Sequence, residues 1–208
     1  MHKLYFAIAF LVANSVGNAA DLGRQFITAK LAYGASVSVP KSWQVLRGNE
    51  MRAIGTSVGA AIDLAGYAQQ LEGSETLIVA NFPDPQLYAG MTITTLSTPS
   101  LTSALPASLT NAQVKAGEAT IRQAVEAVQA RLGTKVFGWS PLHKTVVGRN
   151  TVMYTSYLRS SAAGERRVHL YKFFGSGRTY DLALSTSVAH ESLNGVVLEK
   201  IANSFVVP

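Results

Sequence analysis

The sequence contains no cysteine among its 208 residues. Disulfide bridges, thiol nucleophiles and thiolate metal sites are therefore excluded. We also expect no lipid anchor of the bacterial lipoprotein type, because such an anchor is attached to a cysteine directly after the leader. Thiol chemistry is thus removed from every candidate function.

Charged residues are scarce, at 14% of the chain, while hydrophobic residues make up 48%. The mean hydropathy is +0.18. This composition excludes a disordered polyelectrolyte and a membrane protein, and it suits one globular domain with a proper core. Lysine and arginine outnumber aspartate and glutamate by 18 to 12, a net charge of +6 that favours non-specific attraction to anionic surfaces.

Long apolar runs are also absent. The run at residues 4–13 is shorter than the roughly 20 apolar residues of a membrane-spanning helix. It follows His2 and Lys3, and small residues stand at 17–20. This order is typical of a secretory signal peptide cleaved after Ala19 or Ala20; the alternative is a buried N-terminal helix. We expect a signal peptide at residues 1–20 and a single domain at 21–208, soluble in the periplasm or secreted.

Residues 150–187 carry the clearest structural pattern, three antiparallel strands joined by two tight turns. Val152, Tyr154 and Leu158 alternate with polar residues, as in a half-buried strand. Glycines at the two turns supply the positive φ that hairpin loops need. The middle strand, residues 167–174, has apolar side chains on both faces, which predicts helices above and below the sheet.

Helices are predicted at residues 49–71, at 110–132 and at the C-terminal end around 193–205, from apolar residues spaced three and four apart. Thr110 and Gln113 form a capping box at the start of the second helix. A loop is predicted at 99–109, and the segment 21–30 has no clear form. Further strands are predicted at residues 35–39, 45–46, 77–82 and 91–97.

Three segments together resemble the PsbP-like superfamily: residues 36–43 with Pro40 and Trp43, residues 180–185 after the turn glycine Gly164, and residues 201–205 ending in Phe205. The superfamily includes the extrinsic PsbP protein of photosystem II, a Ran-binding import factor and bacterial envelope proteins such as DcrB. The resemblance, from about Tyr33 onward, implies an α+β fold, a three-layer α/β/α sandwich around a mainly antiparallel sheet. It also implies binding or assembly in place of catalysis, although the acidic Ran-binding surface has no counterpart here.

A serine hydrolase is the competing function. Residues 55–59 match the G-x-S-x-G nucleophile elbow, with Ser57 as nucleophile, and Asp181 and His190 follow in the order of an α/β-hydrolase. However, the elbow needs a strand before it, and residues 50–54 form a poor one. No βαβ alternation is visible either. The alternative is a glycine-spaced helix packed closely on the sheet.

Arg159, Arg166, Arg167, Lys172 and Arg178 form a basic cluster in residues 150–187. It predicts a surface for an anionic partner, an envelope protein or an anionic envelope surface, with Arg167, Lys172 and Arg178 as the binding contacts. The alternative is a set of solvated turn and edge charges that discourage strand pairing.

Other chemistries have weak support. His143, His169 and His190 stand far apart in sequence, so neither a metal nor another cofactor is predicted. The twelve carboxylates are scattered, and no pair for glycoside chemistry stands out. Nucleic acid is not expected as a partner outside the cytoplasm. Trp43 and Trp139 are interpreted as core aromatics, although Trp43 could also line a groove.

Overall fold

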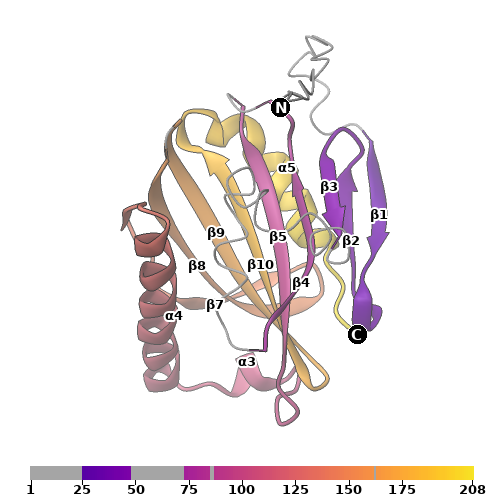
Figure 1. Ribbon diagram of the computed structural model, residues 1–208. Coiled ribbons are helices and arrows are strands. Elements are labelled where there is room, and N and C mark those ends of the chain that lie inside the picture. Colours follow the sequence, from indigo (N-terminus) through magenta and orange to yellow (C-terminus); the bar gives the residue numbers. More distant parts are fainter. Residues whose placement is uncertain (1–24, 48–72, 85–86, 162) are drawn as a thin grey trace, which may run out of the picture.

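The computed structural model describes residues 25–47, 73–84, 87–161 and 163–208. The predicted signal peptide and the predicted helix at 49–71 lie outside the described residues. Within them, helix α4 (Asn111–Arg131) packs on one face of a large sheet and helix α5 (Glu191–Ser204) on the other (Figure 1). The predicted α+β sandwich around an antiparallel sheet is confirmed.

The large sheet has eight strands in the described part of the chain, in the order β3-β4-β5-β10-β9-β8-β6, with β7 paired to β8. Every pairing is antiparallel. The three strands predicted at 150–187 are confirmed as β8, β9 and β10. The bounds are β3 (Gln44–Arg47), β4 (Glu75–Asn81), β5 (Ala89–Ser97), β6 (Val136–Phe137), β7 (His143–Val147), β8 (Asn150–Ser161), β9 (Gly164–Gly175) and β10 (Arg178–Ser187).

Helix α5 covers the apolar face of the central strands because its buried residues recur every three and four positions. Ile201 is fully buried against this face, which contributes about 2 kcal/mol. Phe205 follows the last helical turn and meets Phe173 edge to face, with ring centroids 4.8 Å apart. Leu193, expected in the apolar stripe, is 38% exposed because it lies on the outer side of the first turn.

The N-terminal half of α5 is anchored through a buried amide. Asn194 is 1% exposed, and its side-chain nitrogen donates to Thr186 Oγ1 at 2.8 Å. The same nitrogen also donates to the carbonyls of Leu87 and Tyr88. These bonds satisfy a buried polar group and fix the position of α5 on the sheet.

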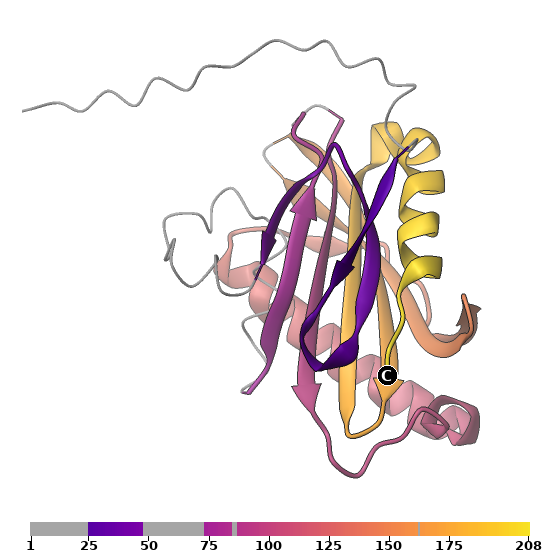
Figure 2. The same cartoon turned by 90° about the vertical axis from the view of Figure 1, so that its right-hand side faces the viewer.

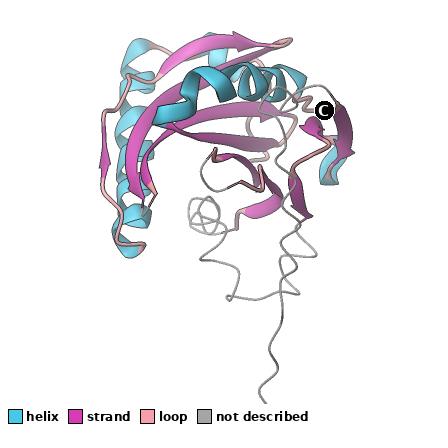
Figure 3. Cartoon of the chain, turned by 90° about the horizontal axis from the view of Figure 1, so that it is seen from above, coloured by secondary structure: helices cyan, strands magenta, loops and turns pink. Residues whose placement is uncertain are grey.

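Helix α4 begins as predicted, with the Thr110 and Gln113 capping box formed in full. Its buried residues Val125 and Val128 face the opposite side of the sheet, where Val125 packs with Leu170 of β9. Leu132 was predicted to continue this stripe but is 48% exposed, because it caps the helix after its last turn. Seen from above, the sheet separates α4 from α5 (Figure 3).

Strands β1 (Phe26–Lys30) and β2 (Ser36–Pro40) form a separate two-stranded sheet beside α5 (Figure 2). Val37 and Val39 of β2 are fully buried in the same core as α5. The chain end joins this sheet through a bridge between Ser36 and Val206. The segment before residue 30 thus acquires its form by pairing with a later strand.

One short α-helix and two 3-10 turns complete the fold of the described residues. Helix α3 (Leu105–Ser108) lies within the segment predicted as loop at 99–109, and Pro106 stands in its first turn. The 3-10 turn η4 (Val188–His190) leads from β10 into α5. The turn η2 (Ala32–Gly34) joins β1 to β2, and Tyr33 within it has a positive φ of 60°.

Candidate functional site

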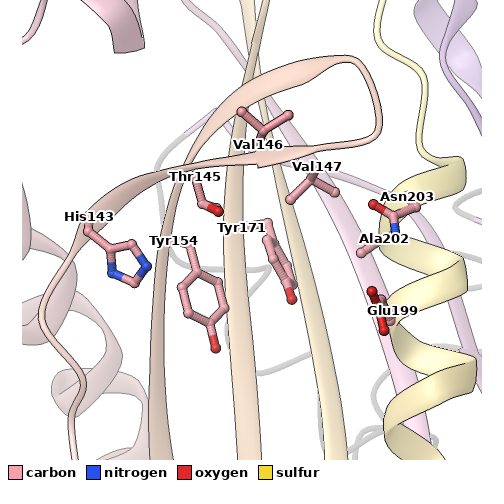
Figure 4. A pocket seen from close by; sticks show the side chains of 9 residues that line it. All are labelled: His143, Thr145, Val146, Val147, Tyr154, Tyr171, Glu199, Ala202 and Asn203. Atoms are coloured by element: carbon pink, nitrogen blue, oxygen red, sulfur yellow. The ribbon is translucent and has the colours of Figure 1, made fainter.

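A cleft of about 300 Å³ lies between strand β7 and helix α5, over the strands β8 and β9. We call it the β7–α5 cleft. Figure 4 shows β7 crossing above β8 and β9, with two tyrosine rings below it and α5 as the far wall. Its lining residues are His143, Thr145, Val146, Val147, Tyr154, Tyr171, Glu199, Ala202 and Asn203.

The β7–β8 turn is held against α5 by hydrogen bonds. Gly148 N donates to Asn203 Oδ1 at 3.0 Å, and Asn150 Nδ2 donates to the Phe205 carbonyl at 3.4 Å. Gly148 has a φ of +59°, and a Cβ there would meet the Asn203 carbonyl oxygen at 2.7 Å. Only glycine combines this backbone conformation with so close an approach. The roof of the cleft is therefore fixed to its wall.

The floor is a row of aromatic residues in register across three strands. His143 of β7 is the partner of Tyr154 of β8, and Tyr154 is the partner of Tyr171 of β9. The tyrosine rings lie 4.8 Å apart at 40°, and the His143 ring meets Tyr154 edge to face at 5.2 Å. Directly opposite residues share a face of the sheet, so strand pairing alone assembles this row.

Polar atoms of the floor are partly satisfied within the protein. The Tyr154 hydroxyl and His169 Nδ1 are hydrogen-bonded at 2.8 Å. His143 Nδ1 lies 3.0 Å from the Pro141 carbonyl, which can only accept, so this nitrogen carries a proton, and Nε2 is an acceptor in the neutral form of the ring. Among the described residues, the Tyr171 hydroxyl and the Glu199 carboxylate have no hydrogen-bond or ion-pair partner.

Burial decides the protonation of the floor. It lowers the pKa of His169 below its usual value, opposed by Glu191 and reinforced by Arg167. Burial also raises the pKa of Tyr154, and it raises that of Tyr171 further, with Tyr154 and Glu199 adding to the effect. At neutral pH His169 is consequently uncharged and both tyrosines keep their protons.

Comparison with known proteins bears on the fold. No family model and no curated protein sequence matches the chain. Among solved structures, cyanobacterial PsbP from Synechocystis is similar at a TM-score of 0.54, with 13% identity over 88% of this chain and 92% of that one. The chain has the PsbP-like fold.

Two further solved structures are similar at lower scores. LpqN, involved in cell envelope biogenesis of Mycobacterium tuberculosis, matches at a TM-score of 0.45 and 10% identity, over 88% of this chain and 91% of that one. A Pseudomonas aeruginosa protein of unknown function matches at 0.39 and 12% identity, over 89% and 98% of the two chains.

In this PsbP-like sheet the three predicted binding contacts do not lie together. Arg167 pairs with Glu191 at 2.8 Å on the α5 side. Lys172 pairs with Asp181 at 2.5 Å on the α4 side, five positions further along the same strand. Arg178 stands at the β9–β10 turn, 3.4 Å over the Tyr33 ring. Each of the three cations therefore already has a partner within the protein.

Two other members of the predicted basic cluster, Arg159 and Arg166, are not freely solvated side chains. Arg159 is 1% exposed on the α4 side of β8, so it is part of the interior and contributes nothing to a basic surface. Arg166 lies 3.6 Å over the Tyr88 ring. Among the aromatics, Trp43 is buried in the core, as predicted, and Trp139 packs on Tyr157 with ring centroids 4.7 Å apart.

The residues of the hydrolase alternative are also separated. Ser57 and its glycines lie outside the described residues. Asp181 is bound to Lys172 and stands six positions before Ser187 on β10, a span of about 20 Å. His190 lies beyond that point, in η4. Asp181 and His190 are therefore too far apart for one to orient the other.

No group of three or more histidine, aspartate or glutamate side chains stands close enough to hold a metal within residues 25–47, 73–84, 87–161 and 163–208. None of the helices described there has the length and hydrophobicity that crossing a membrane takes.

Sequence reasoning missed the β7–α5 cleft. The sequence patterns give His143 no role, because no second histidine stands near it, and they place Tyr154 on a half-buried strand. Their common row depends on the register between β7, β8 and β9, and residues 143 to 171 give no short motif for it. The signal that was available is the alternation in β8 and β9, which places Tyr154, His169 and Tyr171 on sheet faces.

Proposed function

We propose that the protein is an exported, non-catalytic binding protein of the cell envelope, and that it holds its ligand in the β7–α5 cleft. The cleft carries this proposal. It offers about 300 Å³, at the small end of ligand sites, over an aromatic floor with a few convergent polar groups. Export rests on the signal peptide predicted at residues 1–20.

A blocked cleft tests the binding role. Thr145 points into the cleft (Figure 4), and Thr145→Trp would fill it from β7. We expect the purified wild-type protein to retain a small molecule from an envelope extract, detected by native mass spectrometry. The Thr145→Trp variant should lose it. Ala127→Trp on the exposed side of α4 is the matched control and should retain it.

Retention of the same molecule by Thr145→Trp would overturn the cleft as the ligand site. Export is tested separately by cell fractionation of the full chain. The expected product is an extracytoplasmic protein whose mass corresponds to cleavage after Ala19 or Ala20. An uncleaved chain in the cytoplasm would overturn the envelope assignment.

The binding contacts predicted from the sequence remain part of the proposal. Arg167 lies on the same face of β9 as His169 and Tyr171, and its charge influences the pKa of both Tyr154 and His169. Lys172 and Arg178 lie elsewhere and would serve a separate anionic surface. Each of the three residues is replaced by alanine singly, and binding of each variant to envelope fractions is measured. This separates a role at the cleft from a role at a separate anionic surface.

A further inference from the structure

The β7–α5 cleft has one formal charge, and it is negative. Among the residues that line the cleft, Glu199 is the one acidic side chain, and none is a lysine or an arginine. Burial keeps His169, which lies beside Tyr154 on the same side of the sheet, neutral by lowering its pKa. Although the whole chain carries a net charge of +6, the charge that lines the cleft is the Glu199 carboxylate.

Cations on the surrounding elements are held away from Glu199. Lys144 of β7 donates to the carbonyls of Ala107 and Leu109, at 3.2 and 2.7 Å, on the far side of the strand. Arg167 of β9 pairs with Glu191. Lys200 of α5 lies 4.1 Å over the Phe26 ring. Among the described residues, no cation forms an ion pair with Glu199.

The remaining lining groups match a cation as well. The tyrosine rings present π faces, and a cation over such a face is attracted by the ring quadrupole. His143 Nε2 and the Thr145 hydroxyl are hydrogen-bond acceptors. An ammonium group has three N–H donors and no acceptor, so acceptors and aromatic faces together complement it. Val147 of β7, whose side chain points into the cleft (Figure 4), provides apolar contact for an alkyl stem.

We infer that the β7–α5 cleft binds an alkylammonium group, with Glu199 as its counter-ion and the Tyr154 and Tyr171 rings as its aromatic contacts. This inference rests on the proposed function and names the chemistry of its ligand. The volume of about 300 Å³ fits a small amine or a single lysine side chain. The positive net charge of the chain favours a ligand with one positive charge over a polycation.

Nuclear magnetic resonance titration of the purified protein tests the inference, with the backbone amides of Thr145 and Gly148 as reporters. The probe is n-pentylammonium, compared with 1-pentanol and pentanoate, which have the same alkyl chain without the positive charge. We expect a saturable shift with the amine and a weaker or absent one with the other two. Equal binding of amine and alcohol would overturn the inference.

Variants identify the contacts. Glu199→Gln should weaken amine binding about three- to fivefold, since the carboxylate faces solvent. Tyr171→Leu should weaken it about threefold, whereas Tyr171→Phe keeps the ring and should bind nearly as the wild type does. Glu126→Gln on the exposed face of α4 is the control and should have no effect. Unchanged binding in Glu199→Gln would overturn the role of Glu199.

A further arm separates the two sources of the amine. The probe is lysine capped at both ends, and its affinity is compared with that of n-pentylammonium. Tighter binding of the capped lysine would indicate that the natural ligand is a lysine side chain of a protein, and weaker binding would indicate a free amine. Failure of the inference is distinct from failure of the proposed function. If no amine binds but Thr145→Trp still abolishes ligand retention, the cleft is a site for another chemistry.

Discussion

The ion pair between Lys172 and Asp181 allows a quantitative prediction of how much the free energy of unfolding falls when one partner is removed. Its atoms are 2.5 Å apart, and the side chains are 21% and 7% exposed. Removing one partner of a buried pair leaves an uncompensated charge and costs about 3 to 5 kcal/mol. Because Lys172 retains about a fifth of its side-chain exposure, we expect Asp181→Asn to cost about 3 kcal/mol, the low end of this range.

The companion variants isolate the pair. Lys172→Met should also cost about 3 kcal/mol, because it leaves the Asp181 carboxylate buried alone. The double variant Lys172→Met with Asp181→Leu should come within about 1 kcal/mol of the wild type, since well-packed apolar residues replace such pairs at little cost. Urea unfolding followed by tryptophan fluorescence measures all three free energies.

The reasoning is refuted if Asp181→Asn costs less than about 1 kcal/mol, or if the double variant is no more stable than Lys172→Met alone. Either result would mean that Lys172 is not held by Asp181. Lys172 would then be free for the anionic partner predicted from the sequence. A large coupling between the two would instead assign Lys172 to the stability of the sheet.

Three more predictions concern stability. Since burial lowers the pKa of His169, the unfolded chain binds the extra proton first, so the free energy of unfolding should fall from about pH 7 to about pH 5. His169→Gln should flatten this fall, and an unchanged pH dependence would contradict it. Gly148→Ala should cost more than Gly164→Ala in thermal unfolding, because both have positive φ but only the former meets backbone; equal costs would contradict the close approach. Thr110→Ala should cost about 1 kcal/mol through the lost cap, and Thr120→Ala in mid-helix much less, by chemical denaturation; the reverse order would contradict the capping geometry.

Elements governed by local patterns were predictable. The strands β8, β9 and β10 follow from period-two alternation, and the start of α4 follows from the Thr110 capping box. Strand β1 escaped prediction because only Ala29 of its residues is buried, so its alternation is weak. Its extended form comes from hydrogen bonds to β2, a partner that local sequence does not reveal.

The same alternation already indicates that two of the predicted basic contacts, Arg167 and Lys172, do not share a surface. Arg167 and Lys172 are five positions apart on one strand, and an odd separation puts two side chains on opposite faces of a sheet. Proximity in sequence had suggested one surface. The period of the strand, which was known from the sequence, already divides these two residues between two surfaces.

The sequence by itself determined the strands β8, β9 and β10, the alternation of their faces and the start of α4, because these depend on spacing within a few residues. The tertiary structure alone decided that His143, Tyr154 and Tyr171 form one row and that Glu199 faces them. Strand register and helix docking bring together residues far apart in the chain. Both result from the packing of the whole core, so no local pattern encodes them.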